Sequence, residues 1–341
     1  MEITAGGLLE IRITPADVGK RVSVRRVQSG ADEAPSFTDT VGVLTSWDQG
    51  VLTITRKSGV TVHISESSLV AGKVVPPAPA RRRGPAASFE ELARIGARAW
   101  QPLESEPLGG WTLRAAGGFT RRANSVLPLG DPGVPLDEAL ARVTSWYAER
   151  ELPAYVQTAT GAAGTQELLG AELERRGWVN EVSAEVRIAA LAPIADVDTG
   201  AVAGGGGEVR LTRAPDEEWL GMYGRVEDPE VARRVLVAGP SVWFATLPGR
   251  AIGRLVVDGR WAGFAAVEVD PEHRRGGLGT AVMAVLARQA LEEGASAAWL
   301  QVEAENAGAL ALYDGLGFAR HHAYHHFRFR AGAAPAAGGP R

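Results

Sequence analysis

The feature that most constrains the fold is the segment 267–280, where a short apolar run leads through a turn into glycines and then a helix. Val267, Glu268 and Val269 alternate as in a strand, and Asp270-Pro271 breaks the pattern. Apolar residues then recur at helical spacing until Gly294 supplies a stop. The sequence therefore predicts a strand, a tight turn and a helix in immediate succession.

Such a junction is suited to binding an anion. The first N–H groups of a helix have no partners within the helix, and the helix dipole places about half a positive charge there. The glycines of Arg274-Arg275-Gly276-Gly277-Leu278-Gly279 allow a ligand to approach the backbone, and the two arginines add positive charge. We expect a pyrophosphate to bind here.

This pattern resembles the acetyl-CoA pyrophosphate loop of the GNAT superfamily of N-acetyltransferases, with Gly277 and Gly279 at its two glycine positions. Downstream, residues 297–302 read as a strand, and Asn306 begins a short helix that ends at Gly317-Phe318, as in that superfamily. The resemblance covers residues 208–330. It implies an α/β fold, a GNAT-type mixed sheet flanked by helices, and acetyl-CoA as the acyl donor.

The resemblance also assigns roles to individual residues. Asn306 would hydrogen-bond the pantetheine arm, and Tyr313, two helical turns later on the same side, would donate a proton to the departing thiolate. A plain helix cap and a core aromatic are the structural alternatives for these two residues. The expected cofactor-binding residues are Val267, Val269, Arg274, Arg275, Gly276, Gly277, Leu278, Gly279, Thr280, Asn306 and Tyr313.

The general base is harder to assign. Deprotonating a lysine-like amine costs about 4 kcal/mol at neutral pH. Protein N-terminal acetyltransferases of this superfamily carry a glutamate five residues before the motif asparagine, whereas this chain has Gln301 there. Glu268 is the candidate we place beside Tyr313 in the catalytic pair, because it alternates with Val267 and Val269 on the strand that enters the loop. Glu303 and Glu305 remain further candidates.

Proline and glycine divide the chain into several parts. We expect linkers at residues 76–86 (proline- and arginine-rich) and 196–207 (glycine-rich), and a disordered tail at 331–341. The intervening segments are then a barrel at 1–75, a GNAT-like domain at 87–195 and the catalytic domain at 208–330. The GNAT-like domain and the catalytic domain each contain a helix followed by Gly, an aromatic residue and a strand. This shared order predicts a duplicated fold.

The first copy is expected to be degenerate. A strand at residues 123–127 is followed by the loop 130–135 and a helix from Leu136. That loop contains prolines, which remove N–H donors that a pyrophosphate would need. We expect this copy to shape the acceptor site instead.

Residues 1–75 show short β-rich runs at 21–24, 41–44, 51–54 and 60–64, separated by turn signals. They predict a small all-β barrel that resembles the Src-homology type found before some acetyltransferases. Packing, dimerisation of the chain and ligand binding are all open roles for it.

Composition excludes several classes of function. The chain has no cysteine, so it has neither a disulfide nor a thiolate nucleophile, and acyl transfer must proceed without an S-acyl enzyme. A net charge of −4 argues against a nucleic acid partner. No secretory signal or long apolar run is present, which indicates a cytoplasmic protein without a membrane partner. Histidines at 321, 322, 325 and 326 lie on an expected strand with no acidic partner, so we assign no metal.

These observations favour an N-acetyltransferase that moves an acetyl group to a primary amine, on a small molecule or a protein side chain, by direct attack in a ternary complex. One alternative is a non-catalytic acyl-CoA sensor. A third hypothesis is a protein-modifying enzyme whose barrel docks a basic protein acceptor. Neither the acceptor nor the oligomeric state follows from the sequence.

Overall fold

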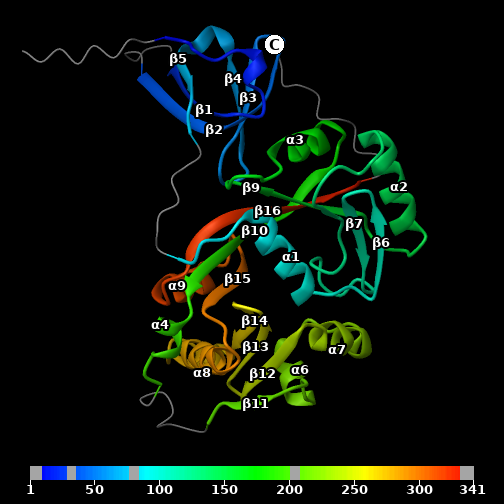
Figure 1. Ribbon diagram of the computed structural model, residues 1–341, viewed down its shortest axis with the longest axis vertical. Coiled ribbons are helices and arrows are strands. Elements are labelled where there is room, and N and C mark those ends of the chain that lie inside the picture. Colours follow the sequence, from blue (N-terminus) through cyan, green and yellow to red (C-terminus); the bar gives the residue numbers. More distant parts are fainter. Residues whose placement is uncertain (1–9, 29–35, 77–83, 200–207, 331–341) are drawn as a thin grey trace, which may run out of the picture.

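The computed structural model describes residues 10–28, 36–76, 84–199 and 208–330 (Figure 1). The expected tail at 331–341 and most of the two expected linkers, residues 77–83 and 200–207, lie outside this description. Within the described ranges, no helix is both long enough and apolar enough to cross a membrane.

The N-terminal part is a bent antiparallel sheet in the order β4-β3-β2-β1-β5. Alternate residues of its strands point inward and form a separate small core: Ile13, Val22, Val24, Leu44, Leu52, Ile54 and Ile64. The sequence predicted four of the five strands and missed the last. The elements are η1 Pro15–Asp17, β1 Arg21–Gln28, β2 Ser36–Asp48, β3 Val51–Thr55, β4 Thr61–Ser65, η2 Glu66–Ser68 and β5 Leu69–Val74.

The rest of the chain repeats one succession of elements twice, which confirms the predicted duplication: helix, three antiparallel strands, helix, strand, helix, strand. The first copy consists of α1 Phe89–Ala99, β6 Glu104–Leu108, β7 Trp111–Ala115, β8 Leu127–Pro128, α2 Leu136–Ala148, β9 Tyr155–Thr160, α3 Glu167–Arg175 and β10 Val179–Ala190.

The second copy has additional elements at its start. It consists of α4 Ala192–Ala195, β11 Arg210–Thr212, α6 Glu217–Tyr223, α7 Pro229–Val237, β12 Ser241–Leu247, β13 Ala251–Asp258, β14 Trp261–Val269, η3 Pro271–His273, α8 Leu278–Glu292, β15 Ala297–Glu303, α9 Ala307–Gly315 and β16 Ala319–Arg328.

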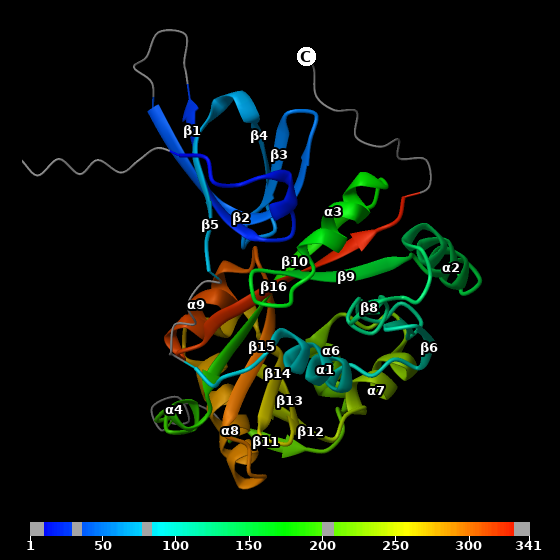
Figure 2. The ribbon, with the colours of Figure 1, turned by 45° about the horizontal axis from the view of Figure 1, so that its top comes forward.

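Strands of both copies form one sheet, in the order β11-β12-β13-β14-β15-β10-β16-β9, while β6, β7 and β8 of the first copy form a separate sheet (Figure 2). The last strand of the first copy, β10, lies between β15 and β16 of the second copy and pairs antiparallel with both. In return, the last strand of the second copy, β16, separates β10 from β9. Each copy therefore completes the sheet of the other.

A shared hydrophobic core reinforces this exchange. Leu92 and Trp100 of the first copy pack in one cluster with Trp261 and Trp299 of the second. Both faces of β10 are covered, because Val186 and Ile188 are buried on one face and Arg187 and Ala189 on the other. A second cluster lies beneath α8, and a third fills the first copy.

The barrel rests on the edge of the shared sheet near β9 and β16 (Figures 1 and 2). The carbonyl oxygen of Lys57, in the β3–β4 turn, accepts hydrogen bonds from Thr160 Oγ1 (3.2 Å) and Arg320 Nη2 (2.8 Å). Gly59 lies so close to the His325 ring that an added Cβ would sit 2.2 Å from it. A glycine is needed at this contact.

The strand predicted at residues 123–127 is wrong. Only Leu127–Pro128 form a strand there, and the preceding residues form a loop that Asn124 organises. The Asn124 side chain accepts from the N–H groups of Ala116 and Gly118 and donates to the carbonyls of Phe119 and Thr120. A side chain that satisfies four backbone groups stabilises a loop in place of a strand.

We predict that residues 208–330 do not fold when they are expressed alone. Without β10, the edges of β15 and β16 lose their partner strand, and the burial of Val186 and Ile188 is lost. This loss is comparable to the whole stability of a typical domain, about 5–15 kcal/mol. Residues 84–330 are the control and should melt cooperatively in circular dichroism. Cooperative melting of 208–330 within a few degrees of that control would contradict the prediction.

Candidate active site

A pocket opens where β14 and β15 separate. The two strands pair in parallel from Trp261↔Ala297 to Phe264↔Leu300 and then diverge. Beyond this point β14 contains a bulge in which Gly253 of β13 faces both Ala266 and Val267, and Ala266 adopts a left-handed φ of 49°. The edge of β14 from residue 265 onward therefore faces a cavity instead of β15.

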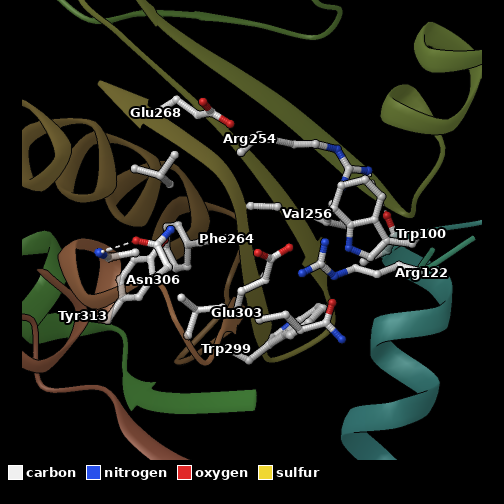
Figure 3. A pocket seen from close by; sticks show the side chains of 18 of the residues that line it. Trp100, Arg122, Arg254, Val256, Phe264, Glu268, Trp299, Glu303, Asn306 and Tyr313 are labelled. Carbon is white, nitrogen blue, oxygen red and sulfur yellow. Dashed lines mark hydrogen bonds between the residues drawn. The ribbon is translucent and has the colours of Figure 1, made fainter. Parts of the chain in front are cut away.

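We call this cavity the splay pocket (Figure 3). Residues of both copies line it. Ala99, Trp100 and Arg122 come from the first copy, and residues of α6, β13, β14, β15 and α9 come from the second. Glu268, Asn306 and Tyr313 lie toward one end in Figure 3, and Trp100 and Arg122 lie toward the other.

The N-terminus of α8 follows directly from β14. Its cap is Gly277, with a φ of 79° and no capping side chain, so the first N–H groups of the helix lack a side-chain acceptor. Arg274 donates to the Val269 carbonyl oxygen (3.2 Å). Gly279 approaches Leu312 so closely that a Cβ would lie 3.2 Å from its Cδ2 atom. The glycines thus bring a bare helix end close to α9.

The structure brings only part of the predicted set into the splay pocket. Val267, Glu268, Asn306 and Tyr313 line it. Val269 and the loop and helix residues Arg274, Arg275, Gly276, Gly277, Leu278, Gly279 and Thr280 lie beyond that lining, on the continuation of β14 and at the start of α8.

Asn306 and Tyr313 both combine a structural role with a place in the pocket. The Asn306 side chain caps α9 by accepting from the Ala309 N–H (3.0 Å). Tyr313 is 7% exposed and packs against Phe318. Burial raises the pKa of Tyr313 to about 12. Its hydroxyl makes no hydrogen bond to any residue that the structure describes, so it is free to donate to a ligand.

Glu268 is half-buried, with 29% of its side chain exposed, and pairs with Arg225 at 3.1 Å. Burial raises the pKa of this carboxyl above its ordinary value, against the opposing charges of Arg225 and Arg274. Of the other two candidate bases, Glu303 lines the pocket and Glu305 does not.

Arg122, Arg254 and Trp100, at the far end of the pocket, are not among the residues predicted from the sequence. Arg254 of β13 is completely buried among apolar neighbours, and its guanidinium lies over the Trp100 ring. A charged residue within the apolar strand 251–257 was the available signal, because a buried charge needs a specific reason. Trp100 and Arg122 carried no such signal, since only the shared sheet brings them to the site.

Comparison with known proteins identifies the family. Residues 87–327 match the family model described as "Probable histone acetyltransferase Rv0428c C-terminal". Over 311 residues the chain is 30% identical to the probable histone acetyltransferase Rv0428c of Mycobacterium tuberculosis, which covers 89% of this chain and 93% of that protein. The chain belongs to this family of GNAT acetyltransferases.

Other similarities to GNAT acetyltransferases agree with this assignment. The chain is 24% identical over 257 residues to the uncharacterized N-acetyltransferase YobR of Bacillus subtilis, covering 71% of this chain and 98% of that one. A GCN5-related N-acetyltransferase from Kribbella flavida has the same fold, with a TM-score of 0.51 at 17% identity, over 72% of this chain and 98% of that chain.

The N-terminal barrel is Sm-like. Residues 16–73 match the family model described as "Rv0428c N-terminal Sm-like domain". Strand spacing alone had suggested the Src-homology type, and the match replaces that name while keeping the predicted small all-β architecture.

The histidines of β16 are packed into the sheet of this acetyltransferase. Burial lowers the pKa of His322 to about 3 and that of His325 to about 4. His325 hydrogen-bonds Thr160 and Ser183. Within the described part of the chain, no group of three or more His, Cys, Asp or Glu side chains is placed to hold a metal.

We predict that Gly263→Ala destabilises the acetyltransferase by about 1–3 kcal/mol, the usual cost of overpacking a core. An added Cβ would lie 2.6 Å from the ring atoms Cε2 and Cζ2 of Trp299, which would have to move into the pocket. Thermal unfolding measures the effect. Gly221→Ala in α6 is the control, since nothing lies within 4 Å of its Cβ position, and it should not destabilise. Equal melting temperatures for wild type and Gly263→Ala would contradict the prediction.

Proposed function

We propose that the chain is an acetyl-CoA-dependent N-acetyltransferase that transfers the acetyl group to a primary amine. The observation that carries the proposal is the splay pocket, which places Tyr313 and Glu268 along one wall of a cavity beside the bare N-terminus of α8. Acetyltransfer needs a proton donor, a base and an anion site close to one another, and the cavity together with the adjoining end of α8 has a candidate for each.

The α8 N-terminus fits the diphosphate of acetyl-CoA. The N–H groups of Leu278, Gly279 and Thr280 would bind its oxygens, and Arg274 and Arg275 would contribute positive charge. Gly277, at a φ of 79°, allows the backbone a conformation that other residues rarely adopt. Asn306 and the unpaired edge of β14 would hold the pantetheine arm. When bound, acetyl-CoA supplies an activated thioester.

Tyr313 would stabilise the departing sulfur. A pKa of about 12 keeps the phenol protonated at neutral pH, so its hydroxyl is always a donor. A thiol ordinarily ionises near 8.5, so complete proton transfer from this phenol to a thiolate is unfavourable. We infer that Tyr313 acts mainly through a hydrogen bond to the sulfur, and that the attacking amine supplies the proton that the thiolate finally takes up.

Glu268 would accept a proton from the amine through a water molecule. Its raised pKa makes the carboxylate a stronger base than an exposed glutamate. The positive charges of Arg122 and Arg225 in the same pocket favour the neutral form of an incoming amine. Direct attack in a ternary complex is favoured, since the chain has no cysteine that could form an S-acyl enzyme.

The relatives favour catalysis over the sensing of acyl-CoA, because they carry the names of acetyltransferases. The name of the Mycobacterium tuberculosis relative points to protein side chains as one acceptor class. Small amines are the other, and the experiment must include both.

The proposal is tested by measuring thiol release from acetyl-CoA with a panel of amino acids, polyamines, aminoglycosides and basic peptides. We predict that Tyr313→Phe lowers kcat about 10- to 100-fold, because a hydrogen bond to a charged group such as the departing thiolate contributes about 1.5–3 kcal/mol. The acetyl-CoA Kd from calorimetry should stay within about twofold, because the hydroxyl makes no internal hydrogen bond. Tight acetyl-CoA binding with no acetylated amine would favour the sensor instead.

We predict that Glu268→Gln removes the acidic limb of the pH profile of kcat/KM. The base must be ionised, so the rate rises as the pH passes upward through the Glu268 pKa, which burial places above its ordinary value. Glu305→Gln is the control, because Glu305 does not line the pocket and its loss should leave the profile unchanged. If the acidic limb is unchanged in Glu268→Gln but lost in Glu303→Gln, the general base is Glu303 and not Glu268.

A further inference from the structure

The far end of the splay pocket contains a buried guanidinium without a counterion. Arg254 has no exposed surface. Its Nε donates to the Leu236 carbonyl (2.7 Å), and Nη2 donates to the carbonyls of Ala99 (2.9 Å) and Ala238 (3.1 Å). Nη1 is buried and has no partner among the described residues. Burial lowers the pKa of Arg254 to about 9, which leaves it charged at neutral pH.

Arg122 places a second guanidinium at the same end. Its Nε donates to the Tyr324 hydroxyl (3.1 Å), and its terminal nitrogens have no hydrogen-bond or ion-pair partner in the described ranges. Both guanidinium groups lie over the Trp100 ring, at 5.7 Å for Arg122 and 4.6 Å for Arg254. In Figure 3, the charged end of Arg122 points into the cavity.

Two further buried polar atoms of pocket-lining residues lack partners in the part of the chain that the structure describes. They are Trp299 Nε1, a donor, and Gln301 Oε1, an acceptor. Arg225 is the third arginine of the pocket, but Glu268 already pairs with it. The end of the pocket near Trp100 therefore offers several free donors and one free acceptor. Across the whole lining, three arginines (Arg122, Arg225 and Arg254) face two carboxylates (Glu268 and Glu303).

A buried guanidinium with an unpaired N–H group is costly unless a ligand accepts that hydrogen bond and balances the charge. The phosphates of acetyl-CoA are not suited to this position, because the α8 loop that fits them lies outside the lining of the pocket. The complementary anion must then belong to the acceptor. A planar carboxylate matches the fork of a guanidinium and can also accept from an indole N–H.

We propose that the acceptor is a free amino acid, whose carboxylate binds Arg122 and the unpaired donors of Arg254 and Trp299 while its amine faces Gln301 and Glu268. This inference rests on the proposed acetyltransfer and specifies its substrate class. The two arginines disfavour a cationic peptide, because a lysine-rich segment would bring further positive charge to this end of the pocket.

The experiment compares each of the twenty α-amino acids with its α-carboxamide as acceptors for the full chain. We expect kcat/KM for at least one amino acid to exceed that of its carboxamide by tenfold or more. Arg122→Gln should raise KM for that amino acid at least tenfold and should raise KM for the carboxamide much less, so that the preference for the acid over the carboxamide is lost. Arg121→Gln is the matched control, because Arg121 is bound outward to Glu181 and does not line the pocket.

Equal rates with acids and carboxamides, or acetylation confined to lysine side chains of peptides, would overturn the inference and leave acetyltransfer intact. A binding readout separates the two proposals where nothing turns over. Calorimetry of the amino acids with the protein saturated by CoA should detect binding that Arg122→Gln abolishes. Binding of this kind without turnover supports the carboxylate site and refutes the transferase, whereas absence of binding refutes the carboxylate site.

Discussion

The position of β10 between β15 and β16 is the constraint on which the rest of the structure depends. This strand pairs with the second copy on both sides, so the first copy cannot move away from it without breaking two ladders. Its residues also join the core that contains Trp100 and Trp299. As a result, Trp100 and Arg122 are fixed opposite β13 and β15, and a pocket that one copy would leave open acquires a second wall.

The two copies differ at the junction of strand and helix where we propose that the cofactor binds. In the second copy, a long β14 passes through a bulge into a helix whose end is free of side-chain caps. In the first copy, β8 has two residues, and α2 also begins without a side-chain cap. The loop before α2 differs in its donors: Pro132 and Pro135 have no N–H, and the Gly133 N–H is bound by the Asp131 side chain. This loop therefore has fewer donors to offer a phosphate. These features are those expected of a degenerate first copy.

Local sequence signals predicted the fold of each copy but could not place the copies against each other. The glycine loop, the α8 periodicity and Asn306 act over short distances, so their elements could be predicted from residue spacing. The strand expected at 123–127 failed because Asn124 bonds to four backbone groups of a loop, a geometry without a periodic pattern. Trp100 and Arg122 could not be found at all, since their part in the pocket depends on pairing between strands more than a hundred residues apart.

The duplication supplies an internal comparison for the buried arginine of the pocket. Arg114 is the fourth residue of β7 and Arg254 the fourth of β13, and both are buried. Arg114 donates through Nε to the Ser125 carbonyl and through Nη2 to the side chains of Ser125 and Gln157, all within its own copy. Arg254 has only backbone carbonyls, and its Nη1 is unused. The same position thus stabilises the fold in one copy and leaves a donor unused in the other. That difference is what the proposed carboxylate site requires of the second copy.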